Sequence, residues 1–192
     1  MERKEEIDEK SDTEREQDLK DEIKEQMSAA EITAIKIENV TDHVKPLVCA
    51  YHVKVPGYAQ RTGKRLFLQP AFFQHGVEPL FATTSRKYEI YFHYPWSEDD
   101  RIDIDLPAGY SLDNADSPAP FGSGQISEYK PSLAITSDDK TLVYKRTFFF
   151  GGGGNLLFPV QSYPQLKAYF DQLHQQDNHT IALRQGAATS SN

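Results

Sequence analysis

The chain has 192 residues, of which 38% are hydrophobic and 11% aromatic, so it can form one good-sized domain, or at most two small ones, with a packed core. Its formal net charge of −8 is concentrated in residues 1–28, which hold 12 of the 29 acidic and 6 of the 21 basic residues; the near-neutral rest has no basic stripe to neutralise the phosphates of a nucleic acid. No apolar run is long enough to span a membrane, and the charged N-terminus is not followed by the apolar stretch of a secretory signal.

Residues 1–28 are predicted to form a charged helical leader or linker. Leu19, Ile23 and Met27 recur every four residues, which gives a narrow apolar stripe if residues 12–28 are helical. We expect a solvated helix that frays. Weak docking through the stripe, or a role as the exposed end of a connecting helix, is the alternative.

Residues 29–185 are predicted to form a mainly β domain, an antiparallel β-sandwich. Runs such as PLVCAYHVKV, KYEIYFHY and RIDIDLP alternate between the two faces of a strand, and turn signals such as Pro56-Gly57 separate them. No helical stretch separates successive strands, which argues against a parallel βαβ architecture. The expected strands lie within residues 31–40, 46–55, 64–70, 87–94, 101–107, 126–135, 141–150 and 179–185.

One C-terminal amphipathic helix is predicted, over residues 163–176. Ser162 is placed to be its N-cap, and Pro164 falls in the first turn. An apolar stripe suited to lying on a sheet is formed by Tyr163, Leu166, Phe170 and Leu173. Residues 186–192 are expected to be a flexible tail.

The sole cysteine, Cys49, could form a nucleophilic pair with His52. However, residues three apart on a strand point to opposite faces, and Cys49 falls on the apolar face of its predicted strand. We therefore expect a buried, inert thiol and no catalytic residue. A single cysteine also excludes an intramolecular disulfide and a multi-cysteine metal site.

We expect neither a metal ion nor another cofactor. The six histidines lack zinc-site spacing, and Gly151–Gly154 lacks the lysine of a phosphate loop, so it is predicted to be a flexible turn. The densest carboxylates are interpreted as solvated surface, with a calcium loop as the alternative. They are Asp99, Asp100, Asp103, Asp105, Asp113 and Asp116.

Aromatic residues around the run FHYPW form the one candidate binding surface. Phe72, Phe73, Tyr94 and Trp96 could stack on a sugar ring, as aromatic platforms do in carbohydrate-binding modules. Packing in the core or at the rim of a sheet accounts for them as well, and we favour that interpretation.

Several strings together resemble the C-terminal region of large bacterial transglutaminase-like proteins. They are VPGYA at 55–59, SRKYEIYFHYPW at 85–96, IDIDLPAGY at 102–110, LVYKRTF at 142–148 and SYPQLKAYFDQL at 162–173. Each motif is only moderately specific, but their order and spacing extend the resemblance over roughly residues 12–185.

The resemblance implies a C-terminal β-sandwich that follows a β-domain of unknown function and a papain-type Cys-His-Asp domain. The catalytic cysteine of that family opens a helix of the central domain, upstream of the region resembled here, whereas Cys49 lies mid-strand. We therefore expect a non-catalytic accessory or interaction domain, with an upstream transglutaminase-like domain or another protein as partner. The residues alone do not indicate a compartment; the resemblance implies an exported or periplasmic parent, and a cytoplasmic one is the alternative. The alternative is a stand-alone carbohydrate- or peptide-binding module.

Overall fold

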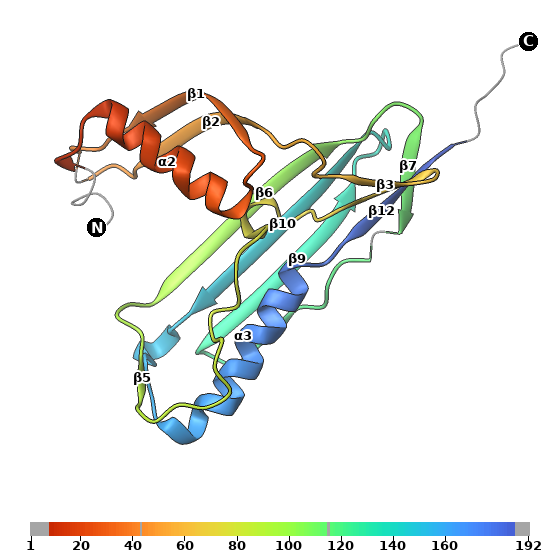
Figure 1. Cartoon of the computed structure of the whole chain (residues 1–192). Coiled ribbons are helices and arrows are strands. Elements are labelled where there is room, and N and C mark those ends of the chain that lie inside the picture. Colours follow the sequence, from red (N-terminus) through yellow and green to blue (C-terminus); the bar gives the residue numbers. More distant parts are fainter. Residues whose placement is uncertain (1–7, 43, 115, 187–192) are drawn as a thin grey trace, which may run out of the picture. The chain divides into compact units, whose positions relative to one another are not determined.

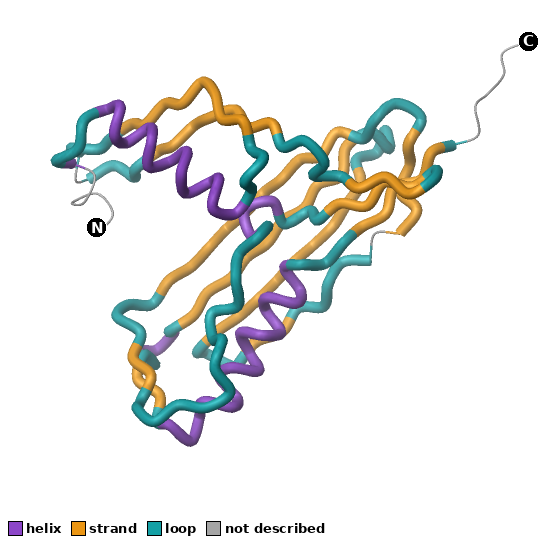
Figure 2. Tube along the Cα trace, in the orientation of Figure 1, coloured by secondary structure: helices purple, strands orange, loops and turns teal. Residues whose placement is uncertain are grey.

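The computed structural model describes residues 8–42, 44–114 and 116–186, and the chain forms two compact units, residues 1–58 and 59–192. The described residues are mainly β, with every strand pair antiparallel and one helix at each predicted place. Figure 2 shows this dominance of strands in the colouring of the trace. Most of the predicted tail, and His43, lie outside the described residues.

The first unit is a helix, α2 (Asp12–Gln26), together with the strands β1 (Glu31–Glu38) and β2 (Val48–Lys54) (Figure 1). A capping box starts the helix: the Ser11 hydroxyl accepts the backbone N–H of Glu14 at 3.3 Å, and the Ser11 N–H donates to the Glu14 carboxylate at 2.8 Å. The apolar stripe of Leu19, Ile23 and Met27 is buried. The expected solvated helix is therefore wrong, because the stripe makes this helix a layer over a two-stranded sheet. The unit extends past the predicted boundary at residue 29 and includes both strands.

The thiol of Cys49 is exposed, so the prediction of a buried cysteine is wrong. Cys49 lies opposite Ile37 in the β1–β2 pair. The same face holds Tyr51 and Val53, which are half-buried as the alternation predicts. Two strands covered by a single helix cannot bury their whole apolar face, and Cys49 lies on the uncovered part.

The second unit contains two four-stranded sheets and a short strand pair (Figure 1). The long sheet has the order β6 (Trp96–Asp105), β10 (Thr141–Phe150), β9 (Ser127–Ile135), β8 (Phe121–Gly122). The other has the order β3 (Gln60–Thr62), β4 (Arg65–Leu68), β12 (Ile181–Gln185), β7 (Tyr110–Asn114). The short pair is β11 (Leu157–Phe158) with β5 (Ile90–Tyr91).

A second helix, α3 (Tyr163–Asp177), lies over the long sheet and confirms the predicted C-terminal helix. Ser162 occupies the N-cap position, but its backbone is already helical (φ −82°, ψ −8°), because a 3₁₀ turn at Val160–Ser162 runs directly into the helix. The predicted stripe is buried and joins one core cluster with sheet residues and with the segment before β5. The cluster consists of Phe81, Ile90, Tyr129, Phe148, Phe150, Tyr163, Leu166, Phe170 and Leu173.

The predicted strand at 87–94 is reduced to Ile90–Tyr91, since its partner β11 is only two residues long. Ile90 is buried as expected, but Tyr88 and Tyr94 are exposed. In contrast, β6 begins at Trp96, five residues before the predicted strand, because all ten of its residues pair with β10. This extension places the acidic run that precedes Arg101 within the sheet.

Candidate functional site

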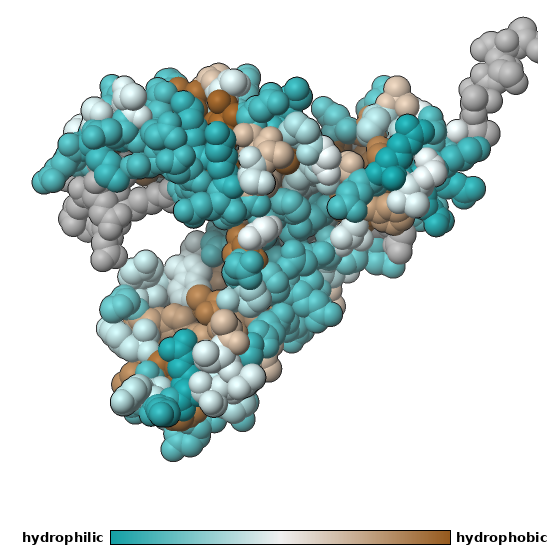
Figure 3. Space-filling view, in the orientation of Figure 1, coloured by the Kyte–Doolittle hydropathy of each residue, from teal (hydrophilic) through white to brown (hydrophobic). Residues whose placement is uncertain are grey.

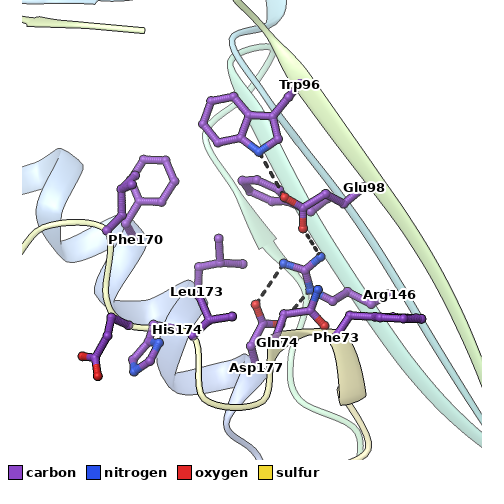
Figure 4. Close-up of a pocket in the computed structure, with 13 residues that line it drawn as sticks. Phe73, Gln74, Trp96, Glu98, Arg146, Phe170, Leu173, His174 and Asp177 are labelled. Carbon is purple, nitrogen blue, oxygen red and sulfur yellow. Dashed lines mark hydrogen bonds and ion pairs between the residues drawn. The ribbon is translucent and has the colours of Figure 1, made fainter. Parts of the chain in front are cut away.

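A pocket of about 450 Å³ lies in the second unit between α3, the strands β6 and β10 and residues 73–80 (Figure 4). This volume is in the range of small-molecule and side-chain binding sites. Its lining residues are Phe73, Gln74, Val77, Glu78, Leu80, Trp96, Glu98, Arg146, Phe148, Phe170, Leu173, His174 and Asp177.

The walls of the pocket are aromatic and aliphatic side chains. The ring of Trp96 stacks on that of Phe170, with centroids 6.2 Å apart and planes 13° from parallel. Trp96 also contacts Phe148 at 5.8 Å between centroids. Aromatic side chains from β6, β10 and α3 therefore meet in the walls, and the contacts between their rings fix the shape of the pocket.

The lip of the pocket, which we define as Phe73, Val77 and Leu80, is apolar and open to solvent. Phe73 is 48% exposed and Leu80 is 53% exposed. On the face drawn in Figure 3 the surface is mostly hydrophilic, with apolar side chains only in small groups. Exposed apolar side chains grouped beside a pocket are typical of an interaction site.

The segment that carries the lip is anchored to α3. The hydroxyl of Tyr163 donates to the carbonyl of Thr83 at 2.5 Å, and the Lys167 ammonium donates to the carbonyl of Phe81 at 2.7 Å. The ring of Phe81 packs edge-on against Phe170 at 5.5 Å. These contacts hold a segment with little regular structure against the helix, so the lip is part of a formed site.

The floor of the pocket is an ion-pair network around Arg146, which is only 2% exposed (Figure 4). Its Nε and Nη2 donate to the two carboxylate oxygens of Asp177 at 2.8 and 2.9 Å. Its Nη1 donates to Glu98 at 2.6 Å and to Asp100 at 3.4 Å. The bidentate pair with Asp177 joins the last turn of α3 to the centre of the sheet.

Strand register explains why these charges meet. In β10 the buried positions alternate, which puts Arg146 on the same face as Tyr144 and Phe148. Arg146 pairs with Asp100 of β6, and Phe148 pairs with Glu98. The interpretation of Asp100 as solvated surface is therefore wrong, whereas Asp103 and Asp105 are exposed as expected. The alternation in TLVYKRTFFF was the signal that could have identified Arg146.

The electrostatics of the floor follow from burial and from this pairing. Burial alone would lower the pKa of Arg146, but the hydrogen bonds and charges of Asp177 and Glu98 more than offset it and raise the pKa above its usual range. Burial raises the pKa of Asp100, and the nearby guanidinium reverses only part of that effect. The phenol of Tyr129 donates to Asp177 at 2.9 Å. The pKa of Tyr129 is raised, mainly by burial and then by the negative charge of Asp177.

Two further polar groups complete the site. The indole N–H of Trp96 donates to Glu98 at 3.2 Å. The amide nitrogen of Gln74 donates to Asp100 at 3.1 Å, while its amide oxygen is buried and has no hydrogen-bond partner among the described residues. A buried acceptor without a partner is uncommon in folded proteins.

The structure brings two of the four predicted binding residues together. Trp96 and Phe73 line the pocket, whereas Phe72 and Tyr94 lie outside it. Phe72 is half-buried and packs edge-on against Phe73 at 5.6 Å, and Tyr94 is exposed. Sequence reasoning missed the charged residues of the floor and the Val77–Leu80 part of the lip.

A family model described as a domain of unknown function with a solved structure, DUF3858, matches residues 64–183. The chain belongs to the DUF3858 family. Every residue that lines the pocket falls within the DUF3858 match. The family description names no activity or partner, and no curated protein or solved structure gives a significant match to the chain.

The described part of the chain contains no group of three or more His, Cys, Asp or Glu side chains arranged to hold a metal ion. Among the same residues, neither helix has the length and apolar character needed to cross a membrane.

The raised pKa of Asp100 gives the protein a specific pH dependence. Because the folded state holds this proton more tightly than the unfolded chain, the group favours folding most below its ordinary pKa of 3.8, and that contribution is lost as the pH rises through the raised pKa. Asp100→Asn stays neutral at every pH, so its melting temperature should gain on the wild type between about pH 4 and pH 7. Thermal unfolding followed by circular dichroism measures this, with exposed Asp99→Asn as the control. A difference that stays constant or shrinks with rising pH would contradict the assignment.

Proposed function

We propose that this chain is a non-catalytic interaction domain that docks a partner protein at the pocket between α3 and the long sheet. The observation that carries the proposal is the exposed apolar lip beside an apolar-walled pocket of about 450 Å³. Exposure of large apolar side chains to water is unfavourable. A partner that covers them removes this surface from water, which favours binding.

The composition of the pocket supports binding over catalysis. None of its lining residues is a Ser, Thr, Cys or Lys, the usual covalent nucleophiles. Asp177 and Glu98 are both held by Arg146, so their charges are already engaged in an ion-pair network. Such an arrangement fixes the shape of a site more readily than it transfers a proton.

A transglutaminase-like domain is the partner that we propose. The support comes from the motif order noted in the sequence, from VPGYA through SYPQLKAYFDQL. Most of these motifs lie within the family match at residues 64–183. In this proposal the chain is the accessory domain of a larger bacterial protein whose catalytic residues lie in another domain.

A carbohydrate-binding module is the weaker alternative. Trp96, the strongest candidate for sugar stacking, packs against four phenylalanine rings, with centroid distances between 5.0 and 6.2 Å. Sugar recognition requires an open ring face, which this packing reduces. The exposed ring of Tyr94 lies outside the pocket.

Selection of peptides from a random phage-displayed library on the immobilised chain tests the proposal. Leu80→Asp puts a charge on the lip and should weaken the selected peptides at least about tenfold, since a large apolar contact is lost. Leu157→Asp is the matched control, because Leu157 is exposed to a similar degree, 59% against 53%, and lies outside the pocket. Failure to enrich any peptide, or equal losses in the two variants, would refute docking at the pocket.

A further inference from the structure

The charge of the pocket identifies the kind of side chain that it accepts. Its lining residues include three carboxylates, Glu78, Glu98 and Asp177, against one guanidinium, Arg146. Asp100 lies behind them as a fourth carboxylate, within 3.4 Å of Arg146. A site that combines apolar walls with an excess of carboxylates complements a cation on an aliphatic stem.

We infer that the pocket binds a lysine side chain of the partner protein, with the ammonium at Glu98 and the stem along Trp96 and Leu173. This inference rests on the proposed function, because it names what a docking partner inserts.

Of the three carboxylates that pair with Arg146, Glu98 is the one that a ligand can reach. Its side chain is 39% exposed, whereas those of Asp100 and Asp177 are 15% and 7% exposed. Each Glu98 oxygen already accepts one hydrogen bond, from the Trp96 indole at 3.2 Å and from Arg146 at 2.6 Å. Each oxygen retains a second lone pair for a further donor.

This occupancy favours lysine over arginine. A guanidinium fork binds a carboxylate best when both oxygens are open to two parallel hydrogen bonds. Both oxygens of Glu98 are partly used, so a compact ammonium with three rotatable donors fits better.

The chain offers a built-in reporter for the test. Trp96 is the single tryptophan of the sequence, so a ¹⁵N-labelled sample gives one indole N–H cross-peak, from the group that donates to Glu98. Three probes of equal chain length separate the contributions of stem and charge: n-hexylammonium, n-hexanol and hexanoate. Each is titrated into the full chain at pH 7 while this cross-peak is followed.

We expect hexylammonium to shift the indole signal saturably and to bind about tenfold more tightly than hexanol, because a charged hydrogen bond adds to the same apolar contact. Hexanoate should bind more weakly than hexanol, since its carboxylate meets like charges. Glu98→Gln should bring hexylammonium and hexanol to within about twofold of each other. Asp99→Asn, which removes one charge from the opposite face of the same strand, should leave the tenfold preference in place.

The outcomes separate this inference from the proposed function. If hexanol and hexylammonium bind the wild type equally, or if Asp99→Asn removes the preference as fully as Glu98→Gln, the lysine site is refuted while peptide docking at the lip stands. If all three probes leave the indole signal unmoved, the lysine site is also refuted. A well-dispersed spectrum of Glu98→Gln shows that the variant is folded. If that variant does not fold, Glu78→Gln replaces it and should reduce the preference.

Discussion

Replacing Arg146 with methionine is expected to lower the free energy of unfolding by about 3–5 kcal/mol. Methionine fills much of the space of the arginine stem but leaves Asp177, which is 7% exposed, as a buried charge without its bidentate partner. The carboxylates of Glu98 and Asp100 lose the same donor. The loss of stability arises from the carboxylates that remain buried without a partner. Removing one member of a buried ion pair costs far more free energy than the intact pair contributes to stability.

Thermal unfolding measures this loss, which corresponds to a fall in melting temperature of about 6–20 °C for a chain of this size. Lys145→Met is the control, since Lys145 is the exposed neighbour on the same strand and should shift the melting temperature by less than about 2 °C. Arg146→Met combined with Asp177→Leu should recover part of the loss, because the double variant removes one of the stranded charges. A single variant that melts with the wild type would show that the network is not the link between α3 and the sheet.

Replacing Phe170 with alanine is expected to cost about 3–5 kcal/mol of stability. Phe170 is buried at the centre of the core cluster, and its ring lies 5.0 to 6.2 Å from those of Phe81, Phe92, Trp96 and Phe150. The alanine variant loses the buried ring and leaves a cavity that the surrounding aromatic groups cannot fill without leaving their own contacts.

Chemical denaturation followed by far-UV circular dichroism measures this second loss. Gln172→Ala is the control on the same helix, where an exposed side chain is truncated. Its effect should stay within about 0.5 kcal/mol. Equal midpoints for Phe170→Ala and Gln172→Ala would mean that α3 does not form the core with the long sheet.

Local patterns predict the elements whose burial follows a simple period. The stripe from Tyr163 to Leu173 has the spacing of a helix that lies on a sheet, and the helix extends from Tyr163 to Asp177. The alternation in 141–150 likewise matches β10. In these segments the apolar residues that set the sequence period are the same residues that pack in the core, so the pattern predicts the element correctly.

Tertiary pairing decides the elements that local patterns do not predict. The acidic run SEDD falls outside the predicted strands, yet it lies within β6 because β10 supplies hydrogen-bond partners along ten residues. Residues 87–94 show the opposite case. Their pattern predicts a long strand, but only two residues form one because the partner strand β11 has only two residues. Glu98 could not be predicted as part of the site for the same reason, since its side chain points inward only if that pairing exists.

The most direct measurement for the central claim follows the indole cross-peak of Trp96 while a peptide selected on the wild-type chain is titrated. The peptide should move the signal saturably in the wild type and in Leu157→Asp, with the affinity that calorimetry gives, and should bind at least about tenfold more weakly to Leu80→Asp. A peptide that binds tightly by calorimetry while the indole signal stays unmoved would place the binding site elsewhere and contradict a docking pocket between α3 and the long sheet.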